Sequence, residues 1–260
     1  MVAMNTITFW TDRRQATDLS PHYLNQSTHR GNTLSELQQY IKSFGPVPNR
    51  TSYLGTCYDG LPLFLDLADP TPGSLLLIGS DEISNTRFIK TILASSMMIN
   101  SIIDLKCSVI SPNVGNYYDL THYDHMEKLL SAFDSAAHKY IVDMAKLAEQ
   151  RRNGRHTGVT HILFIEDLAE IMKYDDFETE NHLSWLTSNG PRNAIWVLAS
   201  IDRQKVEKIG KKMLQCFGTY IFSDMNNNEK RMINHSGNFI EEFSTRLGSE
   251  TLNFYLPMLE

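Results

Sequence analysis

One stretch, residues 75–86, carries the spacing of a phosphate-binding loop. Its apolar run ends in Gly79, and Ser84, Asn85 and Thr86 follow in the frame of the motif G-x-x-x-x-G-K-[ST]. The first glycine and the final hydroxyl residue of the motif are present. Ser84 stands at the second glycine and Asn85 at the lysine. The stretch therefore keeps the frame of a phosphate site without its principal cation.

The charges in this stretch are unfavourable for a phosphate. In such a loop, backbone N–H groups wrap the phosphates, the lysine contacts the β and γ phosphates, and the hydroxyl binds Mg²⁺. Asn85 donates a hydrogen bond but carries no charge, and Asp81 and Glu82 add negative charge where a phosphate would lie. Arg87 and Lys90 follow within one and two turns of the predicted helix and are candidates to compensate.

The same residues also suit an ordinary connection between a strand and a helix. Asp81, Ser84 and Thr86 all belong to residue types that cap helix N-termini. The sequence leaves both interpretations of the loop open.

A second apolar run, in residues 161–172, ends in the acids Glu166 and Asp167. In nucleotide hydrolases a strand of this kind supplies one acid that holds Mg²⁺ and another that orients the attacking water. The usual order is aspartate and then glutamate, so the exchange displaces each carboxylate by about one methylene. A misplacement of about 1 Å can reduce a rate roughly a hundredfold. The alternative is that Asp167 caps the helix that follows.

A third run, residues 194–200, ends in Ser200, and Arg203 follows shortly after. A polar residue at this place would be a sensor that contacts the γ-phosphate, and we name Ser200 and Arg203 as the candidates. The alternative for Ser200 is a polar strand end without a ligand.

These candidates need a scaffold in which strand ends meet. Short apolar runs alternate with helical patterns, which predicts an α/β fold with a mainly parallel, twisted sheet covered by helices on both faces. Ligands bind such sheets at the carboxyl ends of the strands, where Gly79, Glu166 and Ser200 all fall. Strands are predicted at 7–10, 75–78, 105–110, 161–165, 194–200 and 219–223, a hairpin at 53–67 and a last strand within 247–258. Helices are predicted at 33–43, 85–103, 123–151, 181–188, 206–214 and 229–234, and one begins within 167–173.

Length and composition set the remaining expectations. The 260 residues carry a net charge of −6 and suit one large domain at 51–260, preceded by a partly ordered extension at 1–50. Three scattered cysteines, with no signal-peptide pattern and no run of about 18 apolar residues, predict a cytoplasmic protein without a membrane span. The acidic balance argues against free-standing nucleic-acid binding. The basic run 151–156 is a solvated helix end or a contact to DNA backbone.

Taken in order, the segments resemble the motor domain of the FtsK/SpoIIIE family, in the HerA–FtsK branch of P-loop ATPases. The resemblance covers about residues 54–258 and depends on order more than on identities. The first segments are the entering hairpin at 54–69 and Walker A at 75–97. A strand at 105–113, a helix at 143–154 and Walker B at 162–172 follow. The sensor strand is at 194–203, and the last two strands with their connections are at 218–233 and 247–257.

The resemblance implies a RecA-like sheet, a ring of subunits, ATP with Mg²⁺, and translocation of double-stranded DNA. The family also includes relatives in protein secretion that carry degenerate ATPase modules. The nucleotide-binding residues it implies are Gly79, Ser84, Asn85, Thr86 and Arg87, and Thr86 and Glu166 would hold Mg²⁺ only if nucleotide binds.

Because the lysine and second glycine are replaced, we predict a catalytically impaired member without a resident cofactor. It would act as an assembly partner, scaffold or regulator of a motor, in an oligomer with itself or with P-loop ATPase subunits. One alternative is a nucleotide-binding, DNA-translocating ATPase in which Arg87 or Lys90 replaces the missing lysine. Another is an enzyme of a different class that uses Glu166 and Asp167 as acids.

Overall fold

The computed structural model describes residues 33–154, 158–173, 177–223, 242–247 and 250–256. The strands are β1 Thr51–Cys57, β2 Pro62–Asp66, β3 Leu75–Gly79, β4 Leu105–Ser111, β5 Met126–Ser131, β6 Thr160–Ile165, β7 Ile195–Asp202, β8 Thr219–Ser223, β9 Glu242–Leu247 and β10 Glu250–Tyr255. The helices are α1 Thr33–Ser43, α2 Glu82–Ile99, α3 Ser135–Arg152, α4 Leu168–Met172, α5 Phe177–Asn189 and α6 Lys211–Leu214. Short 3₁₀ helices are η2 Val114–His122, η3 Pro191–Asn193 and η4 Arg203–Lys208.

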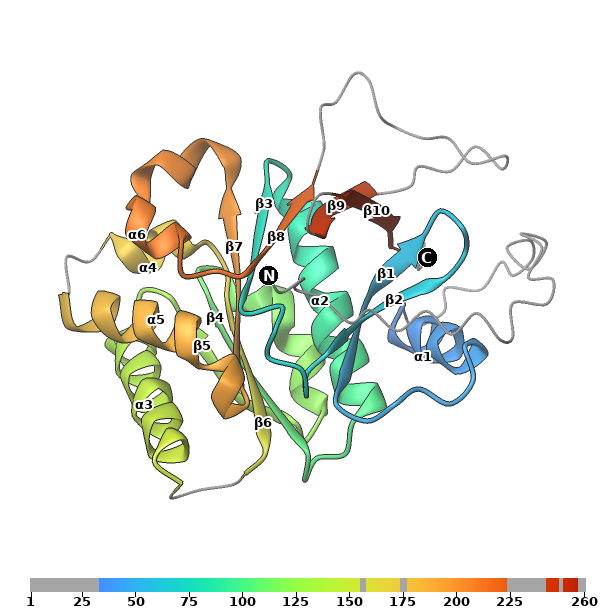
Figure 1. Cartoon of the computed structure of the whole chain (residues 1–260), viewed down its shortest axis with the longest axis horizontal. Coiled ribbons are helices and arrows are strands. Elements are labelled where there is room, and N and C mark those ends of the chain that lie inside the picture. The colour runs from blue at the N-terminus through green and yellow to red at the C-terminus, as the bar shows by residue number, and fades with distance from the viewer. Residues whose placement is uncertain (1–32, 155–157, 174–176, 224–241, 248–249, 257–260) are drawn as a thin grey trace, which may run out of the picture.

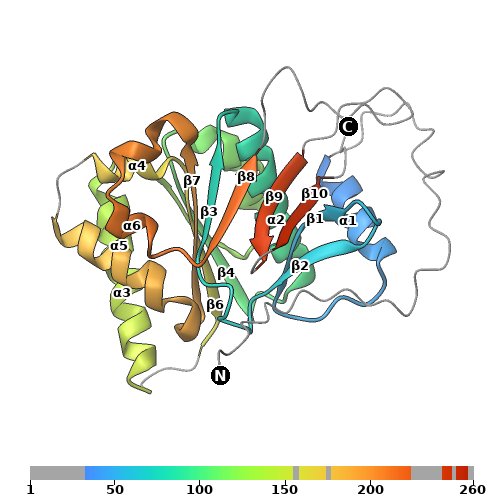
Figure 2. The same cartoon turned by 45° about the horizontal axis from the view of Figure 1, so that its top comes forward.

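The described strands form one ten-stranded sheet in the order β2-β1-β10-β9-β8-β3-β7-β6-β4-β5. From β8 to β5 every neighbouring pair is parallel, and from β8 outward to β2 every pair is antiparallel. Figure 2 shows β3 near the middle of this sheet, between β7 and β8. The prediction of a mainly parallel α/β sheet with the RecA-like arrangement is confirmed.

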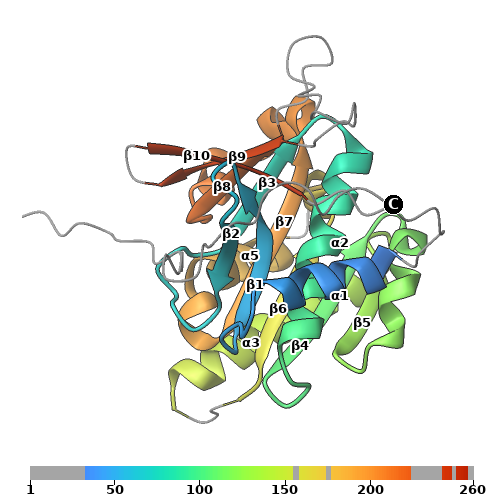
Figure 3. The ribbon, with the colours of Figure 1, turned by 90° about the vertical axis from the view of Figure 1, so that its right-hand side faces the viewer.

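Helices cover both faces of the sheet, and each face has its own apolar core (Figure 1). One core joins α1, α2 and η2 to the sheet, and the other joins α3, α4, α5 and α6. Figure 3 shows α1 beside α2, where Leu37 and Ile41 of α1 are buried in the first core. None of the helices in the described ranges is long and apolar enough to cross a membrane.

The prediction of one helix over 123–151 was wrong in its first part. Residues 126–131 form the edge strand β5, which pairs with β4, and α3 begins at Ser135 after the cap residue Asp134. Met126, Leu129 and Leu130 have helical spacing, but they meet the core from a strand that also carries exposed Glu127 and Lys128. An edge strand needs only part of its residues to be apolar, so its pattern resembles that of a helix.

Two other predicted helices have different bounds in the structure. The helix predicted at 206–214 is divided into η4 and α6, with Gly210 as the cap residue before α6. The helix predicted from residue 85 begins earlier, at Glu82, and ends at Ile99. The strand predicted at 7–10 and the helix predicted at 229–234 lie outside the described residues. The helix at 33–43 and the hairpin of β1 and β2 are confirmed.

Arg151 joins three segments at the edge of the sheet where β6 and β7 begin. Its guanidinium donates hydrogen bonds to the carbonyls of Val159 at 2.8 Å, Asn193 at 3.0 Å and Ala194 at 3.1 Å. The first residue of the basic run is therefore a structural clamp, whereas Arg152 is exposed. Residues 155–157 of that run lie outside the described part.

We expect Arg151→Met to destabilise the fold by about 1.5–3 kcal/mol, because it leaves several carbonyls without their charged donor. Urea unfolding of the purified variant measures the loss. The matched control is Arg152→Met, which removes an exposed charge one residue further on and should change the free energy of unfolding by less than about 0.5 kcal/mol. Equal effects of the two substitutions would contradict the clamp.

Candidate functional site

Several predicted site residues meet in one pocket at the carboxyl edge of the parallel strands. The pocket has a volume of about 390 Å³. Gly79, Asn85, Glu166, Asp167 and Ser200 all line it, as the sequence interpretation requires. The remaining lining residues, most of them polar or charged, are Ser80, Glu82, Pro112, Phe133, Glu170, Ile201, Asp202 and Lys205.

The amino end of α2 is close to the end of β3. Only Ser80 and Asp81 separate the strand from the helix, so the second half of the 79–86 frame is helical. The Asp81 carboxylate accepts hydrogen bonds from the Ser84 backbone N–H, at 3.1 Å, and from the Ser84 hydroxyl. The Asn85 N–H donates to the Asp81 carbonyl at 3.0 Å. The Ser84 and Asn85 N–H groups are thus bonded within the chain.

Asn85 folds back over Gly79. A β-carbon added to Gly79 would lie 2.2 Å from Asn85 Oδ1 and 2.9 Å from Ser223 Cβ. Only 9% of the Asn85 residue is exposed, and its Oδ1 has no hydrogen-bond partner in the described structure. The residue that stands at the lysine of the motif therefore places a buried polar group beside the end of β3.

Glu166 is buried and lies among hydroxyl groups. Its Oε1 accepts hydrogen bonds from Thr86 at 3.0 Å and from Tyr117 at 2.9 Å, and its Oε2 accepts one from Ser111. Burial, with the Glu166 charge as a second cause, raises the pKa of Tyr117, so the phenol keeps its proton and remains a donor. Both oxygens of the first acid therefore have partners from the chain itself.

Asp167 follows directly and is held differently. It has the positive φ of +53° and stands at the N-cap of α4 without a side-chain capping bond. Its N–H donates to Ser200 Oγ at 3.3 Å, and its Oδ2 lies 2.5 Å from Lys205 Nζ. This hydrogen bond is the main cause that raises the pKa of Lys205, which therefore stays charged at neutral pH. Asp167 Oδ1 has no hydrogen-bond partner among the described residues.

Three residues of this site were not predicted. Lys205, to which the sequence analysis assigns no role, lies in η4 and reaches into the pocket. Tyr117 lies in η2, and Ser111 is the last residue of β4. The spacing of apolar residues in strands and helices does not predict such contacts, because each contact depends on how distant segments pack together.

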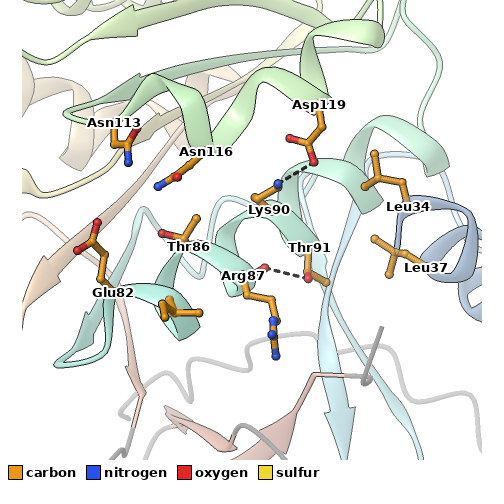
Figure 4. Close-up of a pocket in the computed structure, with 11 residues that line it drawn as sticks. Leu34, Leu37, Glu82, Thr86, Arg87, Lys90, Thr91, Asn113, Asn116 and Asp119 are labelled. Atoms are coloured by element: carbon orange, nitrogen blue, oxygen red, sulfur yellow. Dashed lines mark hydrogen bonds and ion pairs between the residues drawn. The ribbon is translucent and has the colours of Figure 1, made fainter. Parts of the chain in front are cut away.

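The two cations named as replacements for the lysine lie elsewhere. Arg87 and Lys90 line a second pocket of about 590 Å³ between α1, α2 and η2, together with Thr86 (Figure 4). Lys90 Nζ points to Asp119 and lies 2.6 Å from its carboxylate. Arg203 is exposed in η4 and does not line the first pocket. The described residues contain no group of three or more His, Cys, Asp or Glu arranged to hold a metal ion.

Gly79→Ala should destabilise the protein by about 1–3 kcal/mol, because the added methyl overlaps the Asn85 amide and Ser223. The measurement is denaturant unfolding. Gly210→Ala is the matched control, since a β-carbon there has nothing within 4 Å and the residue has no positive φ. In the double variant Gly79→Ala/Asn85→Ala the cost should be partly recovered. A Gly79→Ala protein as stable as Gly210→Ala would show that the close approach is absent.

This chain resembles known proteins in structure but not in sequence. No family model matches it, and no curated protein matches it by sequence. Solved structures do match. The EssC chain with ATPases 2 and 3 from Geobacillus thermodenitrificans is similar with a TM-score of 0.62 and 14% identity, over 83% of this chain and 46% of that one. The corresponding EccC chain from Thermomonospora curvata has a TM-score of 0.61 and 16% identity, over 82% and 41%.

A third similar structure is the pCW3 conjugation coupling protein TcpA, solved with ATPγS. Its TM-score is 0.59 at 16% identity, over 80% of this chain and 66% of that chain. The chain thus spans less than half the length of the secretion ATPases it matches. At these identities the similarity concerns the fold. Together with the strand order and the motif frame, it shows that this chain has the fold of the FtsK/SpoIIIE-type P-loop ATPase domains.

Proposed function

We propose that this chain is a catalytically impaired FtsK/SpoIIIE-like ATPase-fold protein that acts as an assembly partner, scaffold or regulator of a motor. The observation that carries the proposal is the aspartate cap at the amino end of α2. Asp81 caps it with a carboxylate, and the Ser84 N–H and hydroxyl are its donors. A helix N-terminus binds a phosphate through free N–H groups and a positive field, and an aspartate at this place opposes both.

The Mg²⁺ side of the pocket supports the same conclusion. In the resting chain Ser111 and Tyr117 donate to Glu166, and Lys205 pairs with Asp167, so a Mg-nucleotide would have to displace these partners. Loss of one charge-assisted contact to phosphate costs about 1.5–3 kcal/mol. Phosphoryl transfer depends almost wholly on positioning and charge, so such losses act directly on catalysis. The carboxylates that line the pocket belong to Glu82, Glu166, Asp167, Glu170 and Asp202.

The assembly role is supported by similar chains in which domains of this fold occur together. The similar EccC and EssC chains each hold ATPases 2 and 3 in one polypeptide, so more than one such module is present in each. A module that does not turn over nucleotide can still present the surfaces through which such modules meet. The partner we propose is therefore a P-loop ATPase subunit with an intact lysine, or a second copy of this chain.

One contact favours a second candidate function. The Thr86 hydroxyl and Glu166 lie 3.0 Å apart, and these are the two side chains that would share Mg²⁺ in a working site. The alternative is thus a nucleotide-binding, DNA-translocating ATPase with unusual phosphate-site residues. It requires that Asp81 release the amino end of α2 when nucleotide binds.

Calorimetry with Mg-ATP separates the two. We expect no binding by the natural chain at millimolar ATP, and none by Asn85→Lys, because Asp81 still caps the helix. Asp81→Gly/Asn85→Lys frees the amides and restores the cation, and it should bind measurably. Thermal unfolding of each variant verifies that it is folded. Binding by the natural chain at micromolar ATP, or turnover stimulated by DNA, would establish the alternative.

Assembly is tested directly by mixing. The chain should form a defined complex with itself or with an intact P-loop ATPase subunit from the same organism, measured by analytical ultracentrifugation, and should change the turnover of that subunit. The Asp81→Gly/Asn85→Lys variant is the internal control, since assembly without catalysis should not depend on its phosphate site. A chain that neither self-associates nor changes the turnover would refute the scaffold role.

A further inference from the structure

A polar network joins β4, β5, β6 and α3 near the amino ends of the strands. His161 Nδ1 of β6 lies 3.3 Å from Glu127 Oε2 of β5. The same carboxylate oxygen accepts a hydrogen bond from the Tyr140 hydroxyl of α3 at 3.3 Å, and the hydroxyls of Tyr140 and Ser108 lie 2.7 Å apart. The His161 side chain is only 14% exposed. The Glu127 carboxylate therefore ties an outer strand to an inner strand and to a helix.

Strand β5 has few other attachments. It is the outermost strand beyond β4 (Figure 3), and among the described strands it pairs with β4 alone. That ladder has a register shift between Cys107 and Ser108, and none of the six residues of β5 is fully buried. A strand with one partner and little buried surface opens more readily than a central strand. The contacts of Glu127 therefore bear directly on whether β5 stays on the sheet.

His161 is surrounded by charges of both signs. Glu127 lies on β5, Lys106 is the register partner of His161 on β4, and Arg151 belongs to α3. Burial lowers the pKa of His161 below its ordinary value, and the charges of Arg151 and Lys106 lower it further against the opposing effect of Glu127. Burial also raises the pKa of Tyr140, so the phenol remains a donor. At neutral pH the ring is therefore neutral, and its bond to Glu127 requires the tautomer with a proton on Nδ1.

We propose that the His161–Glu127 contact is a proton-sensitive contact that holds edge strand β5 on the sheet. A second proton on the ring puts a positive charge into a shielded site that already faces Lys106 and Arg151. Opening of β5 gives the charged ring access to water, so acid favours the open state. Because the pKa of His161 is lowered in the closed state, closure is fully stable above pH ~6.5 and weakens as the pH falls from there through the folded pKa. The contact lies at the opposite edge of the sheet from the phosphate-site pocket and does not depend on the proposed function.

Amide hydrogen exchange at pH 7.5 and pH 5.5, corrected for the intrinsic exchange rates, tests the proposal. The protection of the β5 amides should fall by roughly three- to tenfold at the lower pH, since one pKa unit corresponds to about a tenfold change. The amides of the central strands β3 and β7 are the internal reference and should change less. His161→Gln keeps a donor for Glu127 but cannot take up a proton, so its β5 amides should lose the response to pH. His122→Gln is the matched control, because it removes an exposed histidine before β5 and should keep the response.

Two further measurements decide the matter if His161→Gln does not fold. The ring protons of His161 in the natural chain, followed by NMR, should titrate below pH ~6.5 in step with the loss of β5 protection. Glu127→Ala removes the acceptor and should lower the β5 protection already at pH 7.5. The proposal is overturned by β5 protection that is equal at the two pH values, by the same response in His161→Gln, or by a His161 ring that titrates at or above its ordinary value.

Discussion

The Asp81 carboxylate accepts two hydrogen bonds from Ser84 at the amino end of α2. This cap determines where the helix begins, and the helix start in turn places Asn85 over Gly79 and Thr86 against Glu166. Gly79 has no β-carbon, which is what permits the approach of Asn85 to the end of β3. In the ligand-free chain, β3, the Asp81 cap and α2 thus fix the positions of Asn85 and Thr86 at this edge of the sheet.

Several polar groups at this edge have partners within the chain, although Asn85 Oδ1 and Asp167 Oδ1 have none among the described residues. In a hydrolase the same positions would leave donors and acceptors available to phosphate, metal and water. Here the Ser84 N–H, both Glu166 oxygens and one Asp167 oxygen have partners from the protein. Such internal bonds stabilise a fixed arrangement, and each must be broken before a ligand can use the group. A ligand that uses these groups must therefore offset the free energy of the internal hydrogen bonds that it replaces.

The fold followed closely from the sequence, because five apolar runs separated by helical patterns leave few arrangements other than a parallel sheet. The common edge for Gly79, Glu166 and Ser200 followed from the same reasoning. Edge strand β5 was missed because its Met126, Leu129 and Leu130 also fit a helical period. Lys205 was missed for a different reason: its neighbours in sequence are solvated lysines, and only the tertiary path of η4 turns this one inward. Contacts of this type have no periodic signal.

The two outer strands of the described sheet, β2 and β5, have a consequence for how copies of this protein can meet. β2 begins with Pro62, which has no N–H to donate, and ends with Asp66, while β5 carries exposed Glu127 and Lys128. Proline and charged side chains on outer strands hinder the addition of a further strand. Growth of the sheet from one molecule into the next is thereby discouraged, so any contact between copies would use helices and loops instead.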